Sequence, residues 1–233
     1  MKKVGLIIFA VALVIGVVVS NMFSVGQAAT TFFNFSCNFK GVRGSGNLAS
    51  ETRNLSNFKA VEVGGIFKVE ITAQKEFSVV VEADDNLIQL ITTEVSDGVL
   101  TIKTAKKISP REEIRIRISA PDIERLDISG VSSVTVSDLN NASLTIDTSG
   151  ASKINLSGKT AELRVDVSGA SKVDAEELQA VNGDIDASGA STVLVNVTGD
   201  LKTQASGASK IVYTGTPANI EKSAHGASRV SQK

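Results

Sequence analysis

The sequence predicts an all-β fold, a parallel β-helix (β-solenoid) in which each coil takes about 20 residues. Three observations predict it: a short motif recurs at a nearly constant period, apolar and polar residues alternate around it, and turn dipeptides fall about one coil apart. Of the 233 residues, 42% are hydrophobic and 21% charged, which is typical of a globular chain of one or two domains. We expect a single β-helix domain over residues 55–233.

The recurring motif is a glycine followed by a small residue and then a serine. Its glycines lie 18 to 20 residues apart, and such a fixed period marks a solenoid. They are Gly130, Gly150, Gly169, Gly189, Gly207 and Gly226. Leucine-rich repeats have a similar period, but they need a regular leucine frame that this sequence lacks.

The residues on both sides of each glycine alternate with period 2. Before Gly150, Leu144 and Ile146 have one parity and Asp147 has the other; after it, Ile154 is opposed to Lys153. A period of 2 predicts strands, so each repeat should hold at least two short strands with the glycine at the corner between them.

If coils stack at the strand spacing of about 4.8 Å, equivalent residues form columns. Two of these columns should face inward. The position two before each glycine gives Ile128, Thr148, Val167, Ala187, Ala205 and Ala224. The position four after it gives Val134, Ile154, Val173, Val193, Ile211 and Val230. The second, continuously β-branched column is the expected core spine, and the shrinking first column predicts thinner late coils.

A serine stands two residues after every glycine, and its parity predicts that it points inward or into the corner. We expect the stacked hydroxyls to pass hydrogen bonds from coil to coil, a structural role. A nucleophilic role needs a base at a matching offset, and the single histidine occurs only in the last repeat. These residues are Ser132, Ser152, Ser171, Ser191, Ser209 and Ser228.

The outward columns beside the corner carry opposite charges and supply the candidate surface residues. On one side these are Asp127, Asp147, Asp166 and Asp186, and on the other Lys153, Lys172 and Lys210. Stacked carboxylates repel each other, and we expect the lysines to offset this through solvated pairs worth about 0–1 kcal/mol each. The alternative is a row of aspartates that binds Ca²⁺ or contacts a basic or sugar ligand.

Residues 55–128 repeat less clearly but also alternate, and we expect them to form irregular early coils of the same solenoid. Within them, residues 108–111 should protrude as a loop, and Asp84, Asp85 and Asn86 should form an acidic turn.

The front of the chain predicts export. Lys2 and Lys3 precede an uncharged, mostly branched run, Val4–Val19, and the small residues Gly26-Gln27-Ala28 follow at cleavage-like spacing. Residues 1–28 are therefore expected to be a signal peptide or an N-terminal anchor, which would be the only contact with a membrane. Residues 29–54 are expected to be a linker or N-terminal cap, with Cys37 as an unpaired thiol.

Several function classes are excluded by composition. One cysteine and one histidine leave no internal disulfide, no Cys-rich metal site and no His-based metal centre. The net charge of −1 gives no broad basic surface for nucleic acid. We expect no cofactor, no metal and no catalytic residue.

Three stretches resemble a known family. GSGNLASETRNLSNFKAVEVGGIFKVEI, VVVEADDNLIQLITTEVSDGVLTIKT and the recurring SGAS corners, in this order, are similar to the head GIN domain family of auto-transporter adhesins in exported bacterial proteins. The resemblance covers nearly all of residues 44–233 and implies a right-handed parallel β-helix. It supplies no catalytic residue.

The expected function is that of a non-enzymatic, extracytoplasmic β-solenoid, an adhesin or a cell-envelope surface-binding or structural protein. Its expected partner is a surface glycan or an envelope or matrix component, and a homo-oligomer is compatible with the open last strand. The alternative is a polysaccharide lyase or hydrolase, for which Asp147, Asp166, Lys153 and Lys172 would be the regular acid–base candidates.

Overall fold

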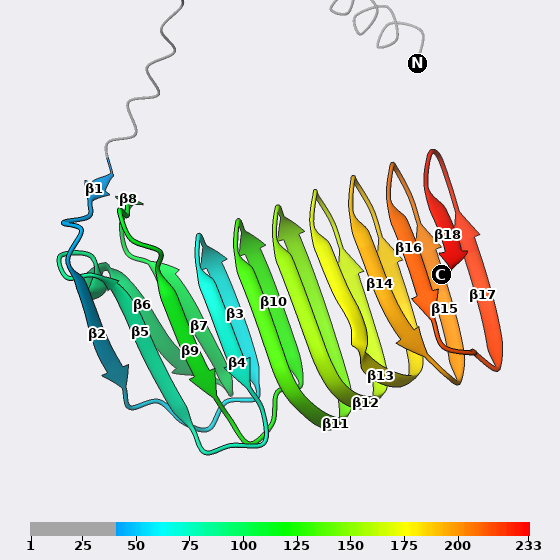
Figure 1. Cartoon of the computed structure of the whole chain (residues 1–233), viewed down its shortest axis with the longest axis horizontal. Helices are drawn as coiled ribbons and strands as arrows, with labels where there is room; N and C mark the ends of the chain where they lie inside the picture. The colour runs from blue at the N-terminus through cyan, green and yellow to red at the C-terminus, as the bar shows by residue number, and fades with distance from the viewer. Residues whose placement is uncertain (1–40) are drawn as a thin grey trace, which may run out of the picture. The chain divides into compact units, whose positions relative to one another are not determined.

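Residues 41–233 fold into stacked parallel coils of a β-solenoid with about 5 turns and roughly 20 residues per turn, as the sequence predicts (Figure 1). The computed structural model describes these residues. The expected signal or anchor at 1–28, residues 29–40 of the expected linker or cap, and Cys37 lie outside them. Residues 41–233 contain no helix with the length and hydropathy that crossing a bilayer requires.

Each regular coil contributes one strand to each of two facing layers, and the glycine corner joins the two strands (Figure 1). The long strands β11 (Ser133–Gly150), β12 (Lys153–Val167) and β13 (Lys172–Ala187) bend and serve both layers. The regular part of the first layer consists of β3 (Ala60–Gly65), β10 (Arg125–Gly130), the second halves of β11 to β13, β15 (Asp200–Ala205) and β17 (Asn219–Ala224). The second layer consists of β9 (Arg115–Ser119), β4 (Lys68–Thr72), the first halves of β11 to β13, β14 (Thr192–Val197), β16 (Lys210–Thr214) and β18 (Arg229–Gln232).

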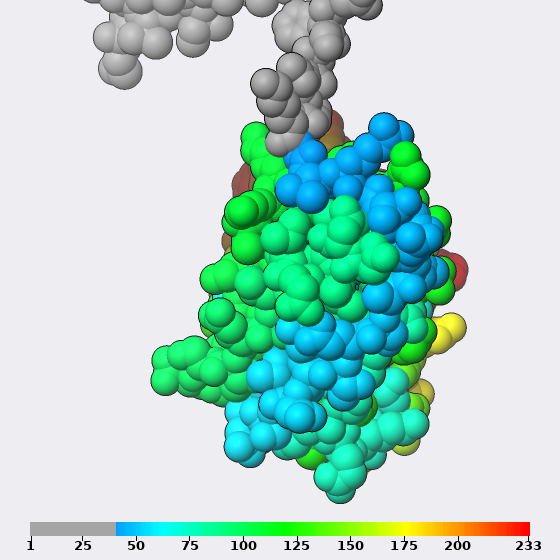
Figure 2. Space-filling view, turned by 90° about the vertical axis from the view of Figure 1, so that its left-hand side faces the viewer, coloured from blue at the N-terminus to red at the C-terminus, as the bar shows by residue number. Residues whose placement is uncertain are grey.

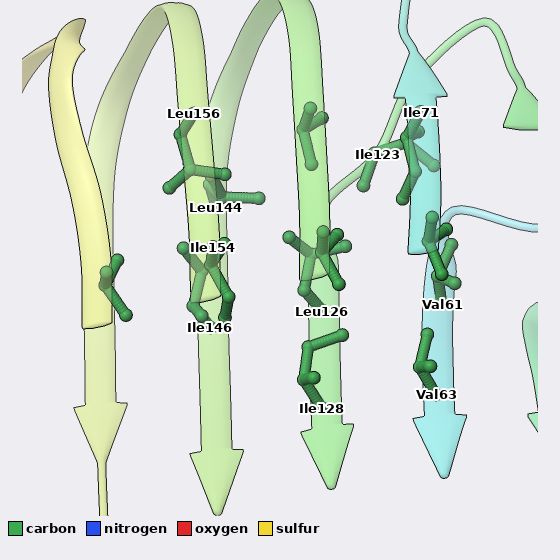
Figure 3. Close-up of a cluster of buried hydrophobic side chains, with 14 of the residues drawn as sticks. Val61, Val63, Ile71, Ile123, Leu126, Ile128, Leu144, Ile146, Ile154 and Leu156 are labelled. Carbon is green, nitrogen blue, oxygen red and sulfur yellow. The ribbon is translucent and has the colours of Figure 1, made fainter. Parts of the chain in front are cut away.

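The strand register confirms both inward columns. Every residue of the two columns pairs with its expected partner in the next coil. The columns also continue into earlier coils, because Val63 pairs with Ile128 and Val69 with Val134. The spine from Val134 to Ile211 is fully buried, and the neighbouring apolar side chains fill the space between the layers (Figure 3). The core of the solenoid is therefore one continuous stack of branched side chains.

The early coils differ from the expectation, because part of residues 78–104 runs antiparallel. The strand β6 (Ile91–Ser96) forms a hairpin with β7 (Val99–Thr104), and β5 (Ser78–Asp84) runs antiparallel to both β2 (Leu48–Arg53) and β9. The cause of the hairpin is local. Its turn is the Asp97-Gly98 dipeptide, both residues have positive φ, and this turn reverses the chain instead of continuing the coil.

The expected loop at residues 108–111 is also corrected. Ile108–Ser109 forms the short strand β8, which pairs in parallel with β1 (Val42–Arg43). The fully buried Asp84 holds this region, because its carboxylate accepts hydrogen bonds from the backbone N–H groups of Gly46 at 2.6 Å and Arg111 at 3.0 Å. Burial alone would raise the pKa of Asp84, but these N–H donors outweigh it and lower the pKa. The 3₁₀ turn η1 (Ile88–Leu90) follows.

The two ends of the described unit are different. Figure 2 views the end at which the described chain begins, and side chains of the early strands close it. At the other end, β17 and β18 have no further strand beyond them in residues 41–233. Lys222 of β17 has inward parity, since it pairs with the buried Thr203. Its ammonium donates to the Tyr213 hydroxyl at 2.8 Å and lies 4.6 Å from the centre of that ring.

Candidate functional site

The glycine corner fixes where the outward columns lie. Gly150 has φ of +107°, and a Cβ added there would stand 2.3 Å from the carbonyl oxygen of Gly130 in the coil before. A side chain at this position is therefore excluded by both backbone conformation and space. Because each corner stacks on the previous one in this way, the residues three positions before and three positions after the glycine stay in register along the solenoid.

The serine column has the expected position but different hydrogen bonds. The hydroxyl of Ser152 donates to the carbonyl of Gly130 at 3.4 Å and accepts from the backbone N–H of Ser132 at 3.3 Å. Ser132 and Ser171 donate to the preceding corner glycine in the same way. The expected hydroxyl-to-hydroxyl relay is therefore wrong. The hydroxyls instead bond to the corner backbone of neighbouring coils: they accept from serine N–H groups and donate to glycine carbonyls, which also accept a backbone N–H.

The acidic column lies on the outward side of the first layer and consists of Glu62, Asp127, Asp147, Asp166 and Asp186. Each carboxylate belongs to a residue paired with its neighbour on the next strand. Burial raises the pKa of Asp127, and the carboxylates of Asp147 and Glu62 raise it further. Burial also raises the pKa of Asp166, and Asp186 and Asp147 add to the effect. The column therefore holds charges that repel one another.

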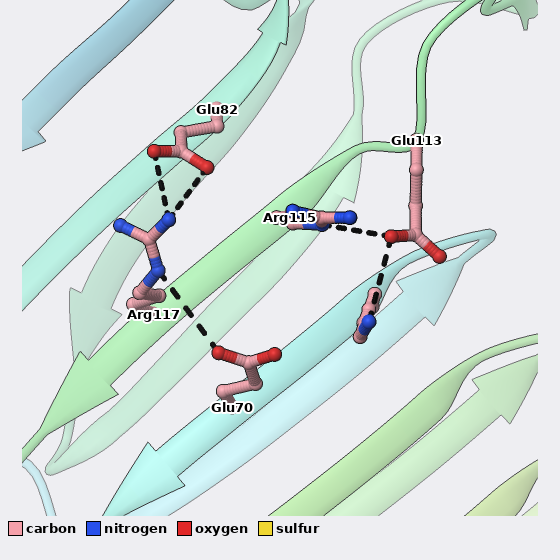
Figure 4. A network of polar contacts seen from close by, with 6 residues as sticks. Glu70, Glu82, Glu113, Arg115 and Arg117 are labelled. Atoms are coloured by element: carbon pink, nitrogen blue, oxygen red, sulfur yellow. Dashed lines mark hydrogen bonds and ion pairs between the residues drawn. The ribbon is translucent and has the colours of Figure 1, made fainter.

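The basic column lies on the outward side of the second layer. It consists of Arg115, Lys68, Lys153, Lys172, Lys210 and Arg229, with Ser133 and Thr192 between them. Its first two members are not evident from the sequence, because the antiparallel early strands interrupt the repeat around them. Glu113 contacts both of them: it lies 2.8 Å from Arg115 (Figure 4) and 3.6 Å from Lys68.

The lysines of the basic column do not neutralise the aspartates of the acidic column, contrary to the expectation. Within residues 41–233, Arg125 supplies the ion pair to the acidic column, 3.0 Å from Asp147 and 3.8 Å from Asp127. Lys172 pairs instead with Asp174 on its own strand, at 3.0 Å. The physical reason is the two-layer fold. The two columns project from opposite outward faces, with the core between them.

The chemistry of these columns is repetitive. The four candidate aspartates occupy equivalent positions on successive coils, and so do the three candidate lysines. In the described part of the chain, no three His, Cys, Asp or Glu side chains group closely enough to hold a metal ion. The arrangement offers the same contact again at each strand spacing, which suits an extended partner better than a single small substrate.

A second candidate site is lined by segments at the ends of the early strands that lie away from the glycine corners; Figure 1 shows these strand ends at its lower edge. A hollow of about 600 Å³ is lined here by Phe77 and by residues 57–60, 97–99, 121–122 and 124–125. The rings of Phe58 and Phe77 pack with their centroids 5.0 Å apart. This site is not evident from the sequence, because its residues come from four separate segments. The one available signal is that all nine Phe lie before residue 78.

Comparison with known proteins supports the fold. A family described as "Putative auto-transporter adhesin, head GIN domain" matches residues 57–217. A crystal structure of a "putative adhesin" from Bacteroides fragilis has a TM-score of 0.72 at 20% identity, over 83% of this chain and 100% of that one. Another "putative adhesin", from Parabacteroides merdae, has a TM-score of 0.52 at 18% identity, over 83% and 99% of the two chains. No curated protein matches the sequence.

Proposed function

The chain belongs to the family described as "Putative auto-transporter adhesin, head GIN domain", and on this premise we propose that it is a non-enzymatic, exported β-solenoid that binds a cell-envelope or surface polymer. The proposal includes export by residues 1–28 and an extracytoplasmic location, at the cell surface, in the periplasm or outside the cell.

One observation carries the proposal, namely the register of the basic column. Lys153 pairs with Lys172, Thr192 pairs with Lys210, and Lys210 pairs with Arg229 on successive parallel strands. An extended anionic polymer laid along this column would meet a new cation at almost every coil. Each solvated contact is weak, about 0–1 kcal/mol, so binding depends on their number.

The available charge on this column supports an acidic glycan as the partner. Lys153, Lys210 and Arg229 are exposed and form no ion pair with another residue of the described chain. Their charge is therefore free for a ligand. Aromatic stacking on sugar rings, which many glycan-binding faces use, has no basis here, because Tyr213 is the only aromatic residue after Phe77 and it is buried.

The test measures binding of the purified full chain to an array of acidic glycans, neutral glycans and matrix proteins. We expect acidic glycans to bind and the signal to fall as salt rises, because exposed charges are screened. The triple variant Lys153→Gln, Lys172→Gln, Lys210→Gln should lose most of this binding. The matched control has the same net charge but changes three exposed lysines outside the column, Lys75→Gln, Lys159→Gln and Lys202→Gln. This control should still bind acidic glycans.

Two results would overturn the proposal. One is an equal loss of binding in both triple variants, which would mean that net charge and not the column is recognised. The other is cleavage of an acidic polysaccharide by the purified chain that Asp166→Asn abolishes, since this would identify an enzyme.

A further inference from the structure

The hollow beneath the early strands has the size and character of a small-molecule site. Its volume of about 600 Å³ falls within the range of about 300–1,000 Å³ that is usual for ligand pockets. The buried Phe58 and the half-buried Phe77 form its apolar wall, with Val99 and Pro121 beside them. The two charged columns lie on the outward faces, so this site is separate from the one on which the proposed function depends.

The cations around the hollow are already paired with carboxylates. The ammonium of Lys59 donates to Glu124 at 2.6 Å, and the guanidinium of Arg125 donates to Asp147 on the acidic column at 3.0 Å. The hydrogen bond from Lys59 and its charge lower the pKa of Glu124. The positive charges at this site are therefore neutralised within the protein and do not call for an anionic ligand.

Asp122 is a carboxylate of the hollow that lacks a hydrogen-bond donor within the described part of the chain at Oδ1. Its side chain is only 26% exposed, yet its Oδ1 accepts no hydrogen bond from any residue in the described part of the chain. Oδ1 has no partner but is closed to solvent, so Oδ2 is the oxygen that a ligand could reach; it lies 3.9 Å from the Lys59 ammonium, which is beyond hydrogen-bond distance. A largely buried carboxylate without donors is costly, so a donor supplied by a ligand would be favoured here. Asp97 adds a second negative charge to the wall.

We propose that this hollow binds a small organic cation, an ammonium group attached to a flat apolar body. The ammonium would donate to Oδ2 of Asp122, and the apolar body would pack on the half-buried ring of Phe77, against which the buried ring of Phe58 packs from within. An aromatic wall also favours a cation next to it, through attraction between the charge and the ring face. An anionic ligand of the same shape would meet Asp122, Asp97 and the paired Glu124, and would be rejected.

The test compares two probes that share a phenylethyl body and carry opposite charges, 2-phenylethylammonium and 3-phenylpropionate, on the purified full chain by saturation-transfer difference NMR titration. We expect saturable binding of the ammonium probe, at least about fivefold tighter than binding of the carboxylate probe. Asp122→Asn keeps the size of the side chain and should weaken the ammonium probe by at least about fivefold, removing the preference. The control Asp138→Asn removes an equal charge from an exposed position outside the hollow and should change nothing.

A second variant guards against an effect of misfolding. Lys59→Gln removes the cation that pairs with Glu124, so the hollow becomes more negative and the ammonium probe should bind more tightly. Damage to the fold cannot produce such a gain. The proposal is overturned if the ammonium probe does not saturate, if both probes bind equally, or if the affinity does not respond to Asp122→Asn and Lys59→Gln.

Discussion

Val173 on β13 pairs directly with Val193 on β14, although twenty positions separate them in the sequence, and both side chains are fully buried. Their contact is one step of a spine that runs through the solenoid from Val69 to Val230. The same register aligns the outward residues, so the core stacking and the charged columns have a single origin. A change that disturbs the spine should therefore also disturb the surface.

Truncation in the spine should destabilise the protein. We expect Val173→Ala to lower the free energy of unfolding by about 2–3 kcal/mol, because it removes buried methyl groups and leaves a cavity between close-packed coils. Denaturant unfolding of the full chain measures the change. Val181→Ala removes the same atoms at a half-exposed position and should cost less than about 0.5 kcal/mol. Equal losses in the two variants would contradict a tightly packed spine.

A methyl group at a stacked corner should cost more than one at an open turn. We expect Gly150→Ala to lower the free energy of unfolding by about 2–4 kcal/mol, because it adds an overlap with Gly130 to the strain of a positive φ. Gly98→Ala bears only the strain, since nothing lies within 4 Å of its added Cβ, and should cost about 1–2 kcal/mol. If calorimetry finds the two variants alike, the corners are not in close contact.

The acidic column should make stability depend on pH. Because the folded state raises the pKa of Asp166, it binds this proton more tightly than the unfolded chain does. The stability that this proton binding contributes is fully present at a pH below the ordinary pKa of about 3.8. It is lost as the pH rises through the raised pKa of the folded state. Asp166→Asn should therefore raise the melting temperature by about 1–2 °C at pH 7 and have no effect near pH 3.

Asp184→Asn is the control for this pH effect. Asp184 lies on the same layer but pairs with Arg164 at 3.4 Å, so neutralising it should not stabilise the protein. The explanation fails if Asp166→Asn has the same effect at both pH values, or if Asp184→Asn gives the same gain.

The inward charge of Lys222 should protect the open end from association. An additional strand stacked on β17 would have to bury this ammonium, which is unfavourable. Inward-pointing charged side chains on edge strands are a common protection against edge-to-edge pairing. We expect Lys222→Leu to increase association with rising concentration, as measured by size-exclusion chromatography with light scattering. Lys202→Leu changes an outward residue on β15 and should associate no more than the wild type. Identical behaviour of the two variants would show that this charge is not the guard.

The regular part of the fold could be predicted from the sequence because each coil repeats the same constraints. Gly150 must be glycine for lack of space, Ser152 must satisfy the corner backbone, and Ile154 must fill the core. Each requirement recurs one coil later, so the period in the sequence is the period in space. The candidate aspartates and lysines follow the same rule, and their register is found as predicted.

What sequence reasoning missed depends on contacts without a period. The antiparallel β5 and β6 follow from the turn at Asp97-Gly98 and from pairing with β2, neither of which repeats. The ion pairs of the aspartates depend on which outward face a side chain occupies, and alternation alone does not give this. The hollow at Asp122 joins four separate segments, so no local pattern reveals it.

The central claim is that the residues of the basic column project side by side on one face. The most direct test places nitroxide spin labels in pairs on a Cys37→Ser background and measures dipolar broadening by continuous-wave EPR. Labels at positions 153 and 172 should broaden strongly, because these residues pair on strands about 4.8 Å apart. Labels at 147 and 153, closer in sequence but on opposite outward faces, should broaden much less. The reverse order would contradict the account.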